Sequence, residues 1–209
     1  MDNARTATPQ QLIARILSRR ADGTDKTFRQ QRANLRRGID ENTETFAIPY
    51  VFPFLSGDSS TYGQKVLLRT AALVAEFVEI PQDDRTSDRP PKPFGRWCYE
   101  VSVAQARKDG QEFILNPDKP DTVAQRLAYI HTQDFEEAVR SVYRLMQYAR
   151  GLTPPPSLDY FGLYRMLSRW GNGISERSRK VRSAPLRHYY AGAASYSPKD
   201  NSDSTTNTH

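Results

Sequence analysis

A dense block of positive charge lies near the end of the chain. From Arg165 to Arg187, seven Arg or Lys residues face one acid, Glu176. The charges of such a block repel one another unless they face solvent or a polyanion, and nucleic acid is the commonest polyanion that binds such a block. Arg165 and Arg169 are four residues apart. They share a helix face, which suits either a phosphate pair or packing against the next helix. We expect the function to lie in this charge.

The cations later in the block point in several directions. Arg177, Arg179 and Lys180 spread around a predicted helix, so one nucleic-acid strand cannot contact all of them. We expect some to contact phosphate and the others only to face solvent. Tyr189 and Tyr190 suit a contact between helices better than stacking on single-stranded bases.

A second group of arginines lies near the start of the chain. Residues 25–38 predict a helix with an apolar stripe, which Gly38 ends. Arg29, Arg32 and Arg36 lie along the shoulder of that stripe. They are either an ordinary solvated flank or phosphate contacts, and the pattern favours neither.

Two isolated arginines have different interpretations. Arg96 lies in the first turn of a predicted helix, where the helix dipole disfavours a cation. Binding of an external anion would explain an arginine at this position, so we favour a functional role for Arg96. Arg69 lies inside the apolar helix predicted over residues 61–80. For Arg69 we favour a structural role, paired with Glu76 or Glu79.

Thiol and imidazole chemistry finds no support. Cys98 is the only cysteine, which excludes an intramolecular disulfide and a thiolate-rich metal site within one chain. It lies between two aromatic residues, where a small buried hydrophobe is expected. The histidines are scattered without the spacing of metal ligands: His131, His188 and His209. We therefore expect no metal and no cofactor.

Paired carboxylates give the enzyme hypothesis its only candidates. Glu136 and Glu137 are adjacent on a predicted helix, where neighbours diverge by about 100 degrees, so they do not easily share one metal or substrate. Asp83 and Asp84 lie in a loop that has no histidine or phosphate-cradling glycine loop beside it. Enzymatic activity is the weakest hypothesis, and we expect none.

The net charge of +6 and pI of about 9.5 conceal a sharper pattern. Residues 1–38 carry a net +6, residues 165–187 again +6, and residues 39–164 a net −5. If the two basic ends converge in the fold, they form a stronger phosphate-binding face than the total charge suggests.

Helical periods dominate the chain and strand alternation is almost absent, so we expect an all-α protein. The pattern predicts helices at residues 9–20 and from Phe94 to about Lys108, and helix caps at Asp134 and Ser157. A proline-rich segment at 81–93 predicts a linker between two small helical bundles, at 1–80 and 94–191. The polar residues 192–209 predict a disordered tail. No apolar run is long enough for a membrane span or a signal core, which indicates a cytoplasmic protein.

Six short segments occur in an order and spacing that resemble one known family. They are Leu35-Arg36-Arg37-Gly38, Val66-Leu67-Leu68-Arg69-Thr70-Ala71-Ala72-Leu73, Phe94-Gly95-Arg96, Val123-Ala124-Gln125-Arg126, Leu158-Asp159-Tyr160 and Arg165-Met166-Leu167-Ser168-Arg169-Trp170-Gly171. Over residues 10–191 the chain resembles CasB, the small subunit of the type I-E CRISPR Cascade complex. It departs from the family's pattern at Pro185 in the last helix and in the added polar tail.

The resemblance implies a non-catalytic, all-helical subunit that acts in antiviral defence. Members of the family form a head-to-tail pair inside the crRNA-containing complex, between its backbone subunits and its large subunit. They hold the unwound target DNA at the hybrid and at the displaced strand, which requires phosphate contacts that ignore base sequence. The nucleic-acid-binding candidates are Arg29, Arg32, Arg36, Arg37, Arg96, Arg126, Arg165, Arg169, Arg177, Arg179 and Lys180.

One alternative is a basic helical DNA-binding regulator that acts by itself. It would need a recognition helix and a preferred duplex sequence, and the pattern contains no convincing helix-turn-helix pair.

Overall fold

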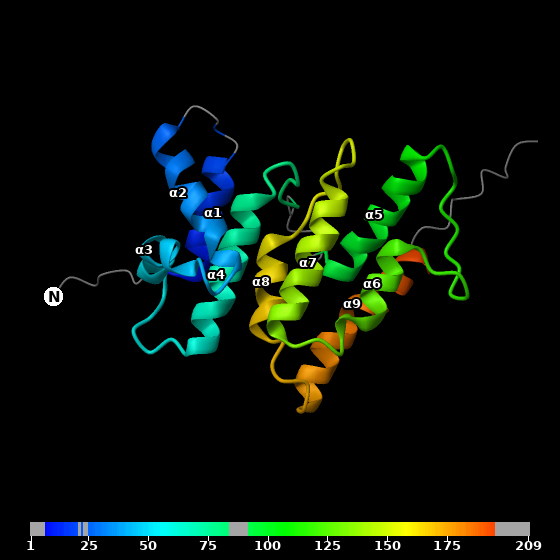
Figure 1. Cartoon of the computed structure of the whole chain (residues 1–209). Coiled ribbons are helices and arrows are strands. Elements are labelled where there is room, and N and C mark those ends of the chain that lie inside the picture. The colour runs from blue at the N-terminus through cyan, green and yellow to red at the C-terminus, as the bar shows by residue number, and fades with distance from the viewer. Residues whose placement is uncertain (1–6, 21, 23–24, 84–91, 195–209) are drawn as a thin grey trace, which may run out of the picture.

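The structure, a computed structural model, describes residues 7–20, 22, 25–83 and 92–194. Every regular element in these ranges is a helix (Figure 1), which confirms the all-α class. The α-helices are α1 (Pro9–Arg20), α2 (Lys26–Arg36), α3 (Ile48–Val51), α4 (Thr61–Glu76), α5 (Phe94–Lys108), α6 (Thr122–Ile130), α7 (Phe135–Ala149), α8 (Tyr160–Ser168) and α9 (Glu176–Ala194). The 3-10 helices are η1 (Arg37–Ile39), η2 (Glu44–Phe46) and η3 (Phe52–Phe54). None of these helices is long and apolar enough to cross a membrane.

Short polar side chains start several of the helices. Asp25 caps α2, Ser60 caps α4, and Asp134 caps α7 by accepting from the backbone N–H of Glu137. The cap predicted at Asp134 is confirmed.

The helix cap expected at Ser157 is wrong, because α8 begins only at Tyr160. The backbone stays extended through Leu158, whose N–H donates to the carbonyl of Pro81 at 2.9 Å. The Ser157 hydroxyl instead donates to Asp83 at 3.0 Å.

The central helix is α4, which contacts α1, α2 and α8. All of its residues from Val66 to Ala75 are buried. A helix enclosed on every side requires apolar residues all round, and this run is apolar except for Arg69 and Thr70.

One continuous core joins the two halves of the described chain, from Leu12 in α1 to Tyr189 in α9. Figure 1 shows α7 and α8 beside α4, and the Tyr62 hydroxyl donates to the carbonyl of Leu167 at 2.7 Å. The division into two bundles stays a prediction, and most of the expected linker and tail lies outside the described residues.

The last helix crosses α5 at very short range. A Cβ placed on Gly95 would lie 1.9 Å from the carbonyl oxygen of Pro185, so only glycine permits this approach. Pro185 is buried inside α9 and does not end the helix. The helix continues to Ala194, further than the boundary at residue 191 that the sequence predicted.

Candidate nucleic-acid interface

The basic block at the end of the chain contains several exposed cations. Arg169, Arg177 and Arg179 are exposed, and their guanidiniums make no hydrogen bond or ion pair within the described residues. Lys180 pairs with Glu176 at 2.7 Å, where both side chains are largely in solvent. Such an exposed pair contributes little and exchanges easily with an external anion. We call Arg165, Arg169, Arg177, Arg179 and Lys180 the α8–α9 surface.

Two hollows divide this surface. Arg165 and Arg169 line a cavity of about 270 Å³, together with Lys92 and His188. Arg179 and Lys180 line a different cavity, of about 620 Å³. The cations of α8 and those of α9 therefore line different hollows, and the predicted spread of Arg177, Arg179 and Lys180 around α9 stays a prediction.

Two arginines of this region bind partners within the protein. Arg165 reaches the buried carboxylate of Asp159 at 3.4 Å, with its own side chain 43% exposed. Arg182 is buried and donates to the carbonyl of Trp170 at 3.1 Å, so it satisfies a backbone acceptor just after the end of α8. Arg165 can still present donors to a ligand, whereas Arg182 is structural.

The α2 arginines are partly engaged. Arg32 donates to the carbonyl of Ala75 at 2.9 Å, and Arg36 forms an ion pair with Glu76. The guanidinium of Arg37 lies 4.2 Å from the ring centre of exposed Phe46.

Arg29 completes the α2 group as an exposed residue of the same helix. The shoulder of α2 is therefore a mixed surface of structural and accessible cations.

Arg96 and Arg126 have partners within the fold. Arg96 donates to the carbonyl of Gly192 and lies 3.6 Å from Glu100, so the fold itself supplies compensation for a cation near the start of α5. Arg126 donates to the carbonyl of Arg144 at 3.4 Å. A role for either in binding nucleic acid stays a prediction.

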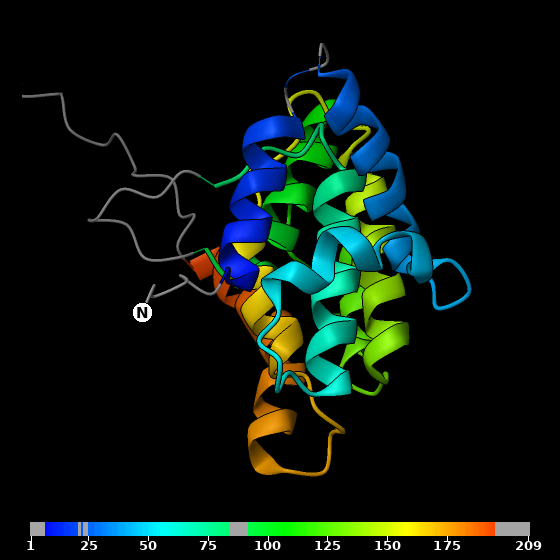
Figure 2. The same cartoon turned by 90° about the vertical axis from the view of Figure 1, so that its left-hand side faces the viewer.

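The candidate cations of α2 do not converge with those of α9, although α1, which belongs to the same basic end as α2, contacts α8. In both views α2 and the first turns of α9 lie at opposite ends of the molecule (Figures 1 and 2). The α2 candidates and the α9 candidates therefore form separate surfaces.

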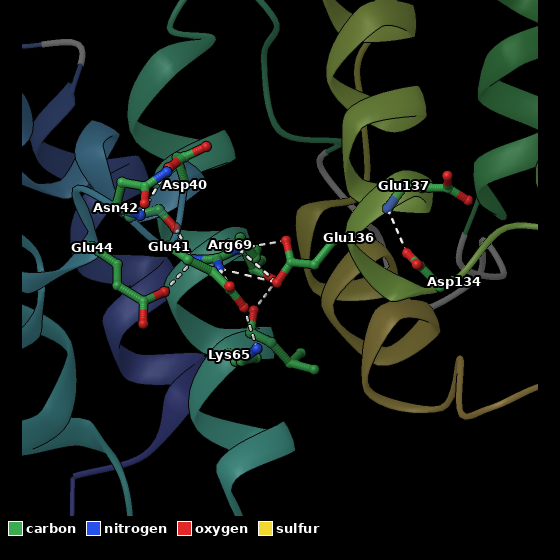
Figure 3. Close-up of polar contacts among 12 residues, drawn as sticks. Asp40, Glu41, Asn42, Glu44, Lys65, Arg69, Asp134, Glu136 and Glu137 are labelled. Carbon is green, nitrogen blue, oxygen red and sulfur yellow. Dashed lines mark hydrogen bonds and ion pairs between the residues drawn. The ribbon is translucent and has the colours of Figure 1, made fainter.

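Arg69 is structural, as the sequence favoured, but its expected partners were wrong. Figure 3 shows its guanidinium between Glu44 and Glu136, at 2.6 and 2.9 Å. It also donates to the carbonyl of Gly38 at 2.7 Å. Burial opposes its charge, but the hydrogen bonds to the two carboxylates prevail and raise the pKa of Arg69. It joins the segments around η1 and η2 to α7.

The residues that carried the enzyme hypothesis serve other roles. Glu136 binds Arg69, and Asp83 accepts from Ser157 and lies 3.5 Å from Lys92. Asp84 lies outside the described residues. Burial raises the pKa of the Cys98 thiol well above its usual value. No cluster of metal-ligating side chains occurs within the part of the chain that the structure describes.

Sequence reasoning missed Arg150. It lies in the cap position after α7 and contacts Glu76 at 3.3 Å and Glu79 at 3.2 Å. The helix dipole favours a cation at a helix C-terminus, so the position of Arg150 at the end of a predicted helix was the one feature of the sequence that indicated a structural role for it. Its approach to Arg36 through Glu76 depends on packing that the sequence does not reveal.

Comparison with known proteins identifies relatives of this fold. The family model of CRISPR-associated protein Cse2 matches residues 31–190. None of the curated proteins matches significantly. A CRISPR-associated protein of the Cse2 family from Thermus thermophilus is 19% identical, with a TM-score of 0.57 over 88% of this chain and 99% of that chain.

Two further solved structures agree. CasB from Thermus thermophilus is 21% identical, with a TM-score of 0.57, covering 88% of this chain and 99% of that one. A chain of a CRISPR RNA-guided surveillance complex, pre-nicking, is 23% identical with the same TM-score, covering 90% and 97%. The resemblance to CasB is confirmed, and since the family model spans most of the sequence, this chain belongs to the Cse2 family of CRISPR-associated proteins.

Proposed function

We propose that this protein is a non-catalytic subunit of a CRISPR RNA-guided DNA surveillance complex, Cascade, and that it stabilises the R-loop in antiviral defence. Its proposed partners are the crRNA-containing complex with its backbone and large subunits, a second copy packed head to tail, and the target DNA. Membership of the Cse2 family supports this role.

The observation that carries the proposal is the set of unengaged guanidiniums on the α8–α9 surface. Arg169, Arg177 and Arg179 are held on or beside helices and lack protein partners among the described residues. Guanidiniums bind phosphate through charge and hydrogen bonds without reading bases. A subunit that must accept every guide requires this kind of contact with the hybrid and the displaced strand.

R-loop formation is nearly balanced in free energy, so a few contacts can decide how long the loop stays open. An exposed cation contributes about 0.5 kcal/mol to such a contact. Removing three of them is expected to shorten the R-loop lifetime by about tenfold, from a loss of about 1.5 kcal/mol.

The test is to express the chain beside the neighbouring genes, purify the complex, and measure R-loop lifetime. The complex is compared without this subunit, with the wild type, and with Arg169, Arg177 and Arg179 changed together to Gln. A control with Arg15→Gln, Arg107→Gln and Lys119→Gln removes the same charge from exposed positions elsewhere. Arg36 and Arg96 suit the test less well, because they have partners within the fold.

Co-purification, together with a shorter lifetime for the α8–α9 variant than for the control, would support the proposal. Normal incorporation with an unchanged lifetime would refute the assignment of these residues. Failure to join the complex, coupled with selective binding to one duplex sequence, would instead support a regulator that acts by itself.

A further inference from the structure

A further hollow with charged walls lies between α2 and α7, apart from the two at the α8–α9 surface. This cavity of about 350 Å³ is lined by Arg36 from the end of α2, Arg37 from η1, Glu76 from α4 and Tyr143 from α7. Apolar side chains complete its lining: Ala33, Ile39 and Ala72. We call it the α2–α7 groove.

One carboxylate of this groove lies between two arginines, of which Arg36 also lines the groove and Arg150 does not. Glu76 pairs with Arg36 from α2 and with Arg150 after α7, the latter at 3.3 Å. The side chain of Glu76 is only 12% exposed, whereas those of Arg36 and Arg150 are 48% and 34% exposed. The anion is therefore recessed, and the two cations that converge on it remain open to solvent.

Convergent guanidiniums of this kind also suit a phosphate. The contact of Arg36 with Glu76 uses its Nε, and Arg150 uses one contact from each terminal nitrogen. A guanidinium carries more N–H donors than these contacts occupy, so both arginines can serve a further acceptor. Arg37 is the second exposed cation of the lining, beside Arg36.

We propose that the α2–α7 groove binds a phosphodiester of a single nucleic-acid strand, and that Glu76 is an internal counter-ion that weakens this binding. The proposal rests on the proposed function and adds a second contact site to it. The ring of Tyr143 and the apolar side chains of the lining provide a surface beside the phosphate for a sugar or a base. A single strand can enter such a hollow, whereas a duplex can touch only its rim.

The role of Glu76 follows from its charge. Its carboxylate repels an incoming phosphate and competes with it for Arg36 and Arg150. Removing the charge releases both arginines for the ligand. The groove therefore binds weakly and reversibly in the wild type, which suits a strand that must be released.

Binding by the purified full-length protein tests this inference. Fluorescence anisotropy measures the affinity for labelled 15-nucleotide oligo(dT), oligo(rU) and a duplex of the same length at several salt concentrations. The variants are Glu76→Gln, Arg150→Gln and the two together. Glu112→Gln is the matched control, since it removes the same charge from the exposed loop between α5 and α6, across the molecule from α2 (Figure 1). Thermal unfolding verifies that each variant is folded.

Glu76→Gln is expected to tighten single-strand binding about fivefold relative to Glu112→Gln, because one competing carboxylate is gone. The slope of log K against log salt should steepen by about 0.7, the value for one more neutralised phosphate on a single strand. Arg150→Gln should weaken binding and abolish most of the gain from Glu76→Gln. Comparing oligo(dT) with oligo(rU) distinguishes DNA from RNA as the preferred source of the phosphodiester.

Equal affinities for Glu76→Gln and Glu112→Gln would overturn the inference, as would a gain that persists in the double variant. Inorganic phosphate is added as a competitor. If it displaces the labelled strand as well as unlabelled oligonucleotide does at the same phosphate concentration, the groove is a simple anion site, and this result would also overturn the inference. The two proposals are tested by different measurements. The proposed function is refuted by R-loop lifetime in the assembled complex, whereas the coupling between Glu76 and Arg150 is measured in the free protein.

Discussion

Replacing Arg69 with Met tests whether the buried network in Figure 3 holds three segments together. Methionine retains most of the side-chain length but removes every donor. The carbonyl of Gly38 then loses its 2.7 Å bond, and Glu44 and Glu136 lose their cation. Their side chains are 21% and 26% exposed, so water offsets part of the loss. We expect the free energy of unfolding to fall by about 3 kcal/mol.

Urea unfolding followed by circular dichroism measures this change in free energy. In a separate thermal unfolding experiment the melting temperature should fall by roughly 6 to 12 °C for a domain of this size. The matched control is Lys65→Met, one turn earlier on α4. Lys65 pairs with Glu41 at the surface, so its loss should cost less than about 1 kcal/mol. A free energy of unfolding for Arg69→Met within about 1 kcal/mol of the wild type would refute the reasoning.

Two further predictions concern α5. Gly95→Ala places a Cβ 1.9 Å from the Pro185 carbonyl and should force α5 and α9 apart, lowering the free energy of unfolding in urea by about 2 kcal/mol or more. An unchanged value would mean that the crossing is looser than the structure shows. Cys98 is fully buried, and burial raises the pKa of its thiol. A disulfide reagent at pH 8 should therefore label the native protein only as fast as the protein unfolds, whereas it should label the urea-unfolded chain at once. Rapid labelling of the native protein would contradict this.

Helix positions followed closely from local sequence. The predicted helices at residues 9–20 and 94–108 agree with α1 and α5, and Asp134 caps α7 as expected. Local propensity, caps and apolar periodicity act within a few residues, so they can be read along the chain.

The errors in the fold arose where distant segments meet. The Ser157 cap failed because Leu158 bonds to Pro81, far away in sequence. Pro185 caused doubt about the last helix, yet α9 passes through it where Gly95 makes room for its carbonyl. Neither partner is visible from the local pattern.

The candidate site shows the same division. The basic block from Arg165 onward predicted accessible cations, and Arg169, Arg177 and Arg179 are exposed. Sequence could not reveal that Arg182 in the same block is buried against Trp170. It also could not reveal Arg150, whose importance comes from its contact with Glu76 on another helix.

The sequence alone therefore determined the all-helical class, most helix ends, the Cse2 family and the presence of two basic regions, because these depend on local residue order and composition. Only the tertiary structure decided which arginines are accessible, that the cations of α2 and α9 lie apart, and that Glu76 lies between Arg36 and Arg150. The physical reason is that a long charged side chain takes its role from the groups that packing brings within hydrogen-bonding distance.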